Sequence, residues 1–219
     1  GAAQVVFDAN LRLEAGEVVA LVGRNGAGKT SLLRAIMGLM DGTRGSVSLS
    51  GQDLSRLPSF ERARRGLGYV PEDRRIFSDL SVAENLRIAA RAQPGGFNEA
   101  DLLEIFPNLA PMLDRRADQM SGGEQQMLAV ARTLATNAAV VLLDEPSEGI
   151  APLVVEKMRE AVVAMKGRGV ATLLAEQNLR FAASVSDRAL LIEHGQLTGE
   201  VGREALLEPS VEVRKVLGL

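Results

Sequence analysis

The sequence has no cysteine, no tryptophan, a single tyrosine and a single histidine among its 219 residues. Without cysteine the chain can form neither disulfides nor thiolate metal sites, which favours a reducing compartment. Aromatic residues make up 3% of the chain, so we do not expect a surface that stacks on nucleic-acid bases. The formal net charge of −3 also lacks the basic excess that binds a phosphate backbone, and we expect no nucleic acid among the partners.

The sequence also lacks a long apolar run. No segment approaches the roughly 20 apolar residues that a membrane-spanning helix requires, so we expect any membrane role to be exerted by docking. Hydrophobic residues make up 46% and charged residues 24%, a balance typical of a chain that buries a sizeable core. The length suits one globular domain, or two at most.

Short apolar runs alternate with helix-compatible stretches over most of the chain. This β-α-β-α order predicts an α/β fold with a mainly parallel sheet and helices on both faces. The expected strands cover residues 17–22, 68–70, 140–143, 170–175 and 189–192. The expected helices cover residues 29–40, 122–136, 152–168 and 179–184. Pro152 opens the third of these helices, a position where proline is favoured.

Two regions interrupt this order. Residues 43–57 alternate apolar and polar side chains, which predicts a small antiparallel β piece beside the first helix. Residues from about 74 to 120 contain no convincing strand, and Ser81 with Glu84 three residues later forms the pattern of a helix-opening capping box. A loop at 93–98 separates that helix from the next. We therefore expect a helical subdomain inserted into the α/β core.

The predicted organisation is a single domain of residues 1–219, whose core comprises residues 1–73 and 121–219 around the inserted subdomain. The last segment, 203–219, is expected to form one or two short helices broken at Pro209. The α/β order with a strand, a glycine-rich loop and a helix at its start is typical of nucleotide-binding folds.

That glycine-rich loop follows the first predicted strand. It matches the pattern G-x-x-x-x-G-K-[ST] with Gly23, Arg24, Asn25, Gly26, Ala27, Gly28, Lys29 and Thr30, followed by Ser31. Glycines let successive N–H groups point at phosphate oxygens, and the helix adds its N-terminal dipole. Lys29 is placed to reach the β- and γ-phosphates, and Thr30 to offer its hydroxyl to Mg²⁺. A solvated glycine turn could carry the same letters, but the flanking strand and helix favour a site for ATP and Mg²⁺.

A second apolar strand ends in two carboxylates, Asp144 and Glu145. Asp144 can hold Mg²⁺ directly or through water. Glu145 is then placed to polarise the water that attacks the γ-phosphate, a general-base task worth roughly 10²–10⁴ in rate. Alone, the pair could be a solvated acidic turn. Combined with the phosphate loop, it predicts ATP hydrolysis with Glu145 and Lys29 as catalytic residues.

A third element opens a predicted helix about twenty residues before Asp144. It comprises Ser121, Gly122, Gly123, Glu124 and Gln125. With Met120 before it, this element resembles the signature of the ABC transporter ATPases, usually written LSGGQ. The resemblance implies that the serine and the glycine backbone contact the γ-phosphate of ATP held by another subunit, since they form a second anion cradle. The order of the three elements argues against a Ser-Gly-Gly turn without a binding role. Because the resemblance places the contacted ATP on another subunit, we expect a second ABC ATPase subunit as a partner.

The resemblance extends over nearly the whole chain, with three departures. Glu72 falls where the family's Q-loop has glutamine, and its carboxylate can still approach Mg²⁺ or a water bound to it. Ser147 and Gly149 fall in the D-loop, within Ser-Glu-Gly-Ile in place of the commoner SALD. Gln177 falls where a switch histidine normally follows the next strand. The resemblance therefore assigns Glu72 to the nucleotide and metal site, Ser147 and Gly149 to the nucleotide, and Gln177 to the catalytic residues beside Glu145 and Lys29.

Gln177 can donate a hydrogen bond to the γ-phosphate, but it cannot carry a proton or a positive charge. We therefore hypothesise that this chain's own phosphate-loop site hydrolyses ATP more slowly than a histidine-bearing partner site, which favours a heterodimer over a homodimer. The sole histidine, His194, has the wrong spacing from Glu145 to act as the switch, and it is expected in a turn between two late strands.

The start of the chain departs from the family as well. The resemblance implies a further strand and an adenine-stacking aromatic residue before Gly1. Phe7 lies too close to the next strand to replace that aromatic. The sequence is therefore expected to lack a short N-terminal segment.

Four strings, VPEDRRIF, MSGGEQQMLA, SEGIAP and AEQN, narrow the resemblance. They resemble the ATPase subunits of branched-chain (hydrophobic) amino acid and amide uptake transporters. The resemblance implies membrane permease subunits and, indirectly, a periplasmic substrate-binding protein as partners, with a peripheral location on the cytoplasmic face of the inner membrane. Urea importers are close relatives with a similar D-loop, and Glu72 favours the amino-acid branch.

Two other classes remain as alternatives. A non-transport ABC ATPase of translation or DNA maintenance is opposed by the short, acidic chain, which has neither tandem ATPase domains nor a long coiled-coil insertion. A P-loop kinase or GTPase is opposed by the Ser-Gly-Gly-Glu-Gln-Gln element. The cargo is not encoded in an ATPase that never touches it, so the transported substrate stays open.

Overall fold

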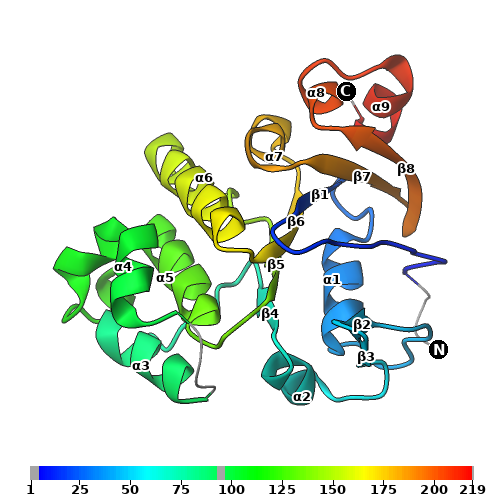
Figure 1. Ribbon diagram of the computed structural model, residues 1–219. Helices are drawn as coiled ribbons and strands as arrows, with labels where there is room; N and C mark the ends of the chain where they lie inside the picture. Colours follow the sequence, from blue (N-terminus) through cyan, green and yellow to red (C-terminus); the bar gives the residue numbers. More distant parts are fainter. Residues whose placement is uncertain (1–4, 93–96, 219) are drawn as a thin grey trace.

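The structure is a computed structural model that describes residues 5–92 and 97–218 (Figure 1). Its centre is a six-stranded sheet in the order β4-β5-β6-β1-β7-β8. The strands are β1 (Val18–Val22), β4 (Leu67–Val70), β5 (Val140–Asp144), β6 (Ala171–Glu176), β7 (Arg188–Glu193) and β8 (Gln196–Gly202). All pairings are parallel except that of β8 with β7 at the edge. The prediction of a mainly parallel α/β sheet is confirmed.

Both faces of the sheet are covered by helices, and this explains why its central strand is wholly apolar. All of β1 is 0% exposed. Val19 and Leu21 pack toward α1 (Lys29–Met37), while Ala20 and Val22 pack toward α7 (Leu179–Val185) on the opposite face. Helices α5 (Gly122–Leu134) and α6 (Pro152–Gly167) join α7 on that second face. The carboxyl ends of the parallel strands meet at one edge, where ligands bind in open α/β sheets.

Several element ends differ from the prediction because of local caps. Helix α1 ends at Met37 rather than at residue 40, since Gly38 adopts φ 74° and donates its N–H to the last carbonyls of the helix. Helix α5 ends at Leu134 rather than at residue 136. Helix α6 begins at Pro152 and ends at Gly167, as the proline and the late glycines indicated.

The predicted antiparallel piece is a two-stranded hairpin of β2 (Ser48–Leu49) and β3 (Gln52–Asp53). The short helix α2 (Ser59–Arg64) follows it and was not predicted. Arg62 joins these parts, because its guanidinium donates to Ser55 O at 2.8 Å beside the hairpin and to Ile36 O at 2.5 Å in α1. This buried arginine fixes the hairpin to α1.

The region between β4 and α5 is helical in the described residues. It contains α3 (Val82–Ala92), α4 (Glu99–Ile105) and the 3-10 segments η1 (Pro107–Met112) and η2 (Ala117–Gln119). The capping box that opens α3 is confirmed, with Ser81 N donating to Glu84 Oε2 at 2.8 Å and Glu84 N to Ser81 Oγ at 3.2 Å. Most of the predicted loop at 93–98 lies outside the described residues, and Asn98 caps α4. In Figure 1 these helices lie beside α5, away from α1.

The C-terminal part contains α8 (Glu204–Leu207) and α9 (Val211–Leu217), separated around Pro209 as predicted. His194 has φ 48° and lies in the turn between β7 and β8, which confirms the prediction of a turn. Across the described ranges, no helix has both the length and the apolar character of a membrane span.

Candidate active site

The glycine-rich loop joins the end of β1 to the start of α1, and close contacts require two of its glycines. A Cβ added at Gly23 would lie 2.3 Å from the carbonyl oxygen of Ile192 on the neighbouring β7. Gly28, the N-cap of α1, has φ 108° and lies against Gly195. Gly195 also donates its N–H to Ala27 O at 2.7 Å. The turn between β7 and β8 therefore supports the loop from behind.

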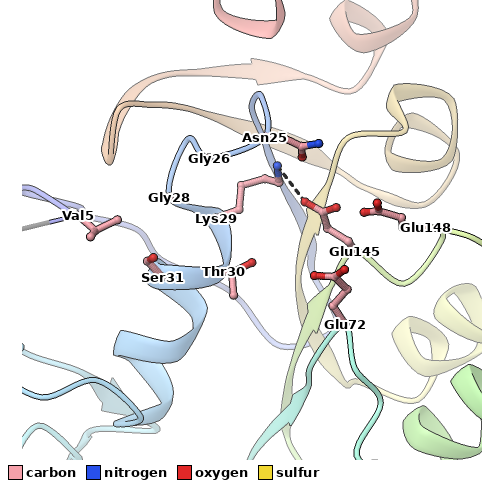
Figure 2. Close-up of a pocket in the computed structure, with 10 residues that line it drawn as sticks. All are labelled: Val5, Asn25, Gly26, Gly28, Lys29, Thr30, Ser31, Glu72, Glu145 and Glu148. Carbon is pink, nitrogen blue, oxygen red and sulfur yellow. Dashed lines mark ion pairs between the residues drawn. The ribbon is translucent and has the colours of Figure 1, made fainter.

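A cavity of about 470 Å³ opens between the loop, the start of α1 and the ends of β4 and β5 (Figure 2). Its lining residues are Val5, Asn25, Gly26, Gly28, Lys29, Thr30, Ser31, Glu72, Glu145 and Glu148. All of them except Val5 and Glu148 are site residues that the sequence predicted. The cavity thus combines one lysine, which can bind phosphate oxygens, with three glutamates, which can bind a cation or a water proton.

Lys29 is 4% exposed at the first position of α1. Its ammonium donates to Gly23 O at 2.9 Å and to Arg24 O at 3.2 Å, and it pairs with Glu145 Oε1 at 3.0 Å. The Lys29 and Glu145 side chains are only 3% and 10% exposed, so water screens the pair little. A buried ammonium at a helix N-terminus suits the phosphate-binding role that the sequence predicts for Lys29.

Glu145 follows β5 and has φ 48°, in the left-handed region that residues other than glycine seldom adopt. Its N–H donates to Ala175 O of β6 at 2.9 Å, which holds this conformation. Backbone strain of this kind concentrates at functional sites. Burial alone would raise the pKa of Glu145, but hydrogen bonds from Glu148 and Lys29 and the Lys29 charge hold it below its usual value. Glu145 is therefore an ionised carboxylate facing the cavity.

Glu148 is a cavity residue that the predicted site did not include. It belongs to a turn in which its N–H donates to Glu145 O at 3.1 Å, so its carboxyl comes back beside that of Glu145 (Figure 2). A hydrogen bond to Glu145 and the negative charge of that carboxylate raise the pKa of Glu148 to about 7. Near neutral pH the Glu148 carboxyl is therefore partly protonated and donates its proton in a hydrogen bond to the ionised Glu145. The sequence predicted Ser147 and Gly149 of this turn instead.

Asp144 is 1% exposed and is held by two side chains. The Thr30 hydroxyl donates to its Oδ1 at 3.0 Å, and the Tyr69 phenol donates to its Oδ2 at 3.0 Å. Burial raises the pKa of Asp144, and these two hydrogen bonds oppose the increase. Burial and the neighbouring aspartate raise the pKa of the Tyr69 phenol, which therefore stays a hydrogen-bond donor.

The oxygen donors around Thr30 were tested against the needs of Mg²⁺. In nucleotide sites Mg²⁺ is bound through one or two protein oxygens and takes waters and phosphate oxygens as its other ligands. Thr30 and Asp144 lie within hydrogen-bond distance, and Glu72 lines the same cavity. No group of three His, Cys, Asp or Glu side chains in the described part of the chain could hold a metal ion. The donors therefore fit a Mg²⁺ shared with a nucleotide rather than a site of protein ligands alone.

The predicted signature lies at the start of α5, where Ser121 is the N-cap. Ser121 N donates to Glu124 Oε2 at 2.7 Å, and Glu124 N donates to Ser121 Oγ at 3.4 Å. This capping box preforms the helix N-terminus, with Ser121 exposed. Of the residues that the structure describes, none from this segment lines the cavity of the phosphate loop. One chain therefore does not bring the two elements together.

Three of the other signature residues have contacts within the chain. A Cβ added at Gly123 would lie 2.6 Å from a methyl of Val154, so α5 packs closely on α6 at this glycine. One added at Gly122 would lie 3.1 Å from the guanidinium of Arg74. Arg74 also donates to Gln125 Oε1 at 3.2 Å. These contacts explain the residue types structurally, and their contact with a partner's ATP stays a prediction.

The D-loop and the switch position are joined by a buried carboxylate, Glu176, which is 2% exposed. It accepts hydrogen bonds from the N–H of Ser147 at 3.0 Å, and from those of Gln177 and Asn178 at 3.1 Å each. Gly149 has φ 66°, a conformation that favours glycine. Gln177 is exposed and, among the described residues, does not line the cavity. Its predicted hydrogen bond to the γ-phosphate therefore stays a prediction.

The residues that sequence reasoning missed are Val5, Tyr69, Glu148 and Glu176. Glu148 had a local signal, because a turn after a strand brings its fourth residue, here Glu148, back beside its first residue, Glu145. Tyr69 could be placed beside Asp144 only once the sheet order put β4 next to β5. Val5 reaches the cavity through the contact of its carbonyl with Gly28 and Gly195, for which the sequence has no signal.

Comparisons with known proteins agree with this geometry. The family model described as "ABC transporter" matches residues 6–148. The chain is 39% identical over 220 residues to the "High-affinity branched-chain amino acid transport ATP-binding protein BraG" of Pseudomonas aeruginosa, covering 96% of this chain and 92% of that protein. It is 34% identical over 221 residues to the "Lipopolysaccharide export system ATP-binding protein LptB" of Haemophilus influenzae, covering 98% and 91%.

A solved structure gives the same fold. The ATP-binding cassette MJ0796, described as a dimeric post-hydrolysis state bound to ADP and Pi, superposes with a TM-score of 0.79. It covers 91% of this chain and 90% of that chain at 22% sequence identity. At this identity the likeness concerns the fold alone.

Proposed function

The chain belongs to the ABC transporter family, and we propose that it is the ATP-hydrolysing subunit of an importer for branched-chain or other hydrophobic amino acids. Its place among the ABC ATPases follows from the family, and the cargo and the partners are our proposal. The observation that carries the role in ATP hydrolysis is the grouping of Lys29, Thr30, Asp144 and Glu145 around the glycine-rich loop. The identity to BraG supports the amino-acid cargo.

We assign the phosphates of ATP to the backbone of residues 23–31 and to Lys29, whose ammonium is buried at the start of α1. Thr30, Asp144 and Glu72 would hold Mg²⁺, which neutralises charge on the β- and γ-phosphates when it is bound. The 3.0 Å contact between Thr30 and Asp144 supports this assignment.

Glu145 is assigned the role of general base. Lys29 and Glu145 neutralise each other at 3.0 Å. Phosphate oxygens that take the Lys29 ammonium would leave Glu145 as the free acceptor for a proton of the attacking water. Movement of the Lys29 ammonium from Glu145 to the phosphates would also raise the pKa of Glu145, because the Lys29 hydrogen bond and charge help to hold that pKa down. Nucleotide binding would thus strengthen the base at the moment it is needed.

A second ABC ATPase subunit would complete the site. Ser121, Gly122 and Gly123, with Glu124 and Gln125, would serve the ATP of that subunit, and the capped N-terminus of α5 supports this role. Ser147, Gly149 and Gln177 would lie at the same interface. We favour a heterodimer with a histidine-bearing partner over a homodimer, because Gln177 cannot carry a proton.

Residues 74–120 would act as a helical subdomain that contacts the membrane permease subunits. Phe77 and Ile88 in this region are 47% and 44% exposed, and we assign them to such a contact. The subunit would then lie at the cytoplasmic face of the inner membrane, with a periplasmic binding protein delivering the cargo from the other side.

The cargo has two other candidates. The identity of 34% to LptB over nearly the full chain favours lipopolysaccharide export as a second function. Urea or another amide is the third, because the Ser-Glu-Gly-Ile D-loop resembles that of urea importers. The sequence of the ATPase separates these candidates weakly, since the ATPase does not touch the cargo.

The decisive experiment is phosphate release by the subunit reconstituted with its permeases in lipid vesicles. We expect low activity for the subunit alone and stimulation by permeases with a leucine-loaded binding protein. Phosphate release with urea in place of leucine tests the proposal of a urea importer. Phosphate release with added lipopolysaccharide tests the proposal of lipopolysaccharide export. Stimulation by lipopolysaccharide but not by the leucine-loaded protein would overturn the amino-acid proposal.

A further inference from the structure

We propose that Tyr69 is a positioning residue that fixes the Asp144 carboxylate for Mg²⁺ from the side opposite to Thr30. The inference rests on the proposed magnesium site and goes beyond it, because Tyr69 would not touch the metal or the nucleotide. It would set how well Asp144 is oriented to receive the metal, as partners behind metal ligands commonly do.

The sheet places the two residues together. Tyr69 on β4 lies opposite Leu142 on β5, and Asp144 is two residues further along β5 on the same face. Diagonal neighbours on adjacent strands are within reach of a long aromatic side chain. The Tyr69 phenol uses this reach and donates to Asp144 Oδ2 at 3.0 Å.

The two oxygens of Asp144 are held from different elements. Thr30 at the start of α1 donates to Oδ1 at 3.0 Å, and Tyr69 on β4 donates to Oδ2. The Thr30 hydroxyl can offer a lone pair to Mg²⁺ and keep its hydrogen on Asp144, so it fixes only one of the two carboxylate oxygens. Tyr69 fixes the other oxygen and with it the rotamer of this carboxylate, which is 1% exposed.

The ring of Tyr69 is itself held in place. It packs at the edge of the apolar cluster that α1 forms with the sheet, which also contains Leu67 and Leu142. Its phenol therefore cannot follow a carboxylate that rotates away. Glu72, which lines the cavity, lies three residues further along the same chain segment. The chain at the end of β4 thus places the Glu72 carboxylate at the cavity and the Tyr69 phenol against Asp144.

The composition of the chain provides a direct readout. Tyr69 is the only tyrosine, and the chain has no tryptophan, so its intrinsic emission reports on this phenol. We expect the emission to change when Mg²⁺ is added with a non-hydrolysable ATP analogue. We expect no such change when the analogue is added with EDTA, or when Mg²⁺ is added alone.

The second measurement compares Tyr69→Phe with the unmodified chain. The Mg²⁺ concentration for half-maximal binding of a ribose-labelled fluorescent ATP analogue should rise by about 10-fold, the lower end for lost partners of metal ligands. Binding in EDTA should stay the same. The matched control is Thr172→Val, because the Thr172 hydroxyl is buried in the same sheet without a hydrogen-bond partner. It should leave both values unchanged.

Four results would overturn the proposal. An unchanged Mg²⁺ requirement in Tyr69→Phe would do so while leaving the magnesium site intact. Equal weakening of binding with Mg²⁺ and with EDTA would assign Tyr69 a purely structural role. Nucleotide binding to the unmodified chain that is independent of Mg²⁺ would contradict the proposed magnesium site, and with it the role of Tyr69. If Tyr69→Phe does not fold, a tyrosine emission that does not respond to Mg²⁺ with nucleotide decides against the proposal.

Discussion

The phosphate-loop side and the signature side of this molecule differ in how complete they are within one chain. Around the loop, Lys29, Asp144 and Glu145 are largely buried and bonded to one another or to the loop. On the signature side, Ser121 and Gln177 are exposed, and the helix cap is closed by the segment itself. Charged groups that act in catalysis need a preorganised site from which water is largely excluded. An exposed helix N-terminus, by contrast, can bind a phosphate that a second subunit brings to it.

The largest expected effect is on the phosphate-loop side, with Glu145→Gln. Turnover should fall by roughly 10²-fold or more, because the amide cannot accept a proton from water. ATP binding should persist or tighten, since Lys29 loses the partner that it now holds at 3.0 Å. Phosphate release and equilibrium nucleotide binding measure the two effects.

The control for this prediction is Glu160→Gln on the exposed face of α6, which removes the same charge far from the loop. Its turnover should match that of the unmodified chain. A Glu145→Gln subunit with near-normal turnover would show that another group accepts the proton, and Glu148 would be the first to examine.

The second prediction concerns packing under the signature. Gly123→Ala should destabilise the fold by about 1–3 kcal/mol, because its Cβ would lie 2.6 Å from Val154. For a chain of this size the melting temperature should fall by about 2–12 °C. Gly167→Ala, in a helix with open space around it, is the matched control and should not destabilise. Val154→Ala combined with Gly123→Ala should recover part of the loss, and no recovery would contradict the packing explanation.

The third prediction is Gln177→His in the assembled transporter. A histidine at this position can carry a proton that glutamine cannot, so turnover at this chain's own phosphate-loop site should rise. The measurement is phosphate release with the partner subunit's hydrolysis disabled. The hypothesis of unequal sites is wrong if turnover does not increase.

The smallest effect is the pH dependence of stability at Glu148. Its pKa is raised to about 7 from an ordinary value of 4.5, so the folded state binds more protons than the unfolded state between these values. The stabilisation is complete below about pH 4.5 and is lost as the pH rises through about 7. In melting curves from pH 5 to 8, the melting temperature of Glu148→Gln should therefore rise relative to that of the unmodified chain as the pH rises. Parallel curves would contradict the raised pKa of Glu148.

Much of the fold could be predicted from the sequence, because it depends on the spacing of apolar residues and on single residues that begin or end helices. The strand at Val18–Val22 is apolar throughout, and Pro152 begins α6 at the position that the sequence predicted. The caps at Ser81 and Ser121 likewise involve residues only three positions apart. Such signals need no knowledge of what packs against them.

By itself the sequence determined the glycine-rich loop, the acidic strand end and the signature, since each is a contiguous pattern whose chemistry depends on short spacing. Only the tertiary structure decided that Tyr69 supports Asp144, that Glu176 ties Ser147 to Gln177, and that Gly123 is required by Val154. These contacts depend on which strands and helices become neighbours. That choice is made by the burial of whole apolar faces, and no local pattern records it.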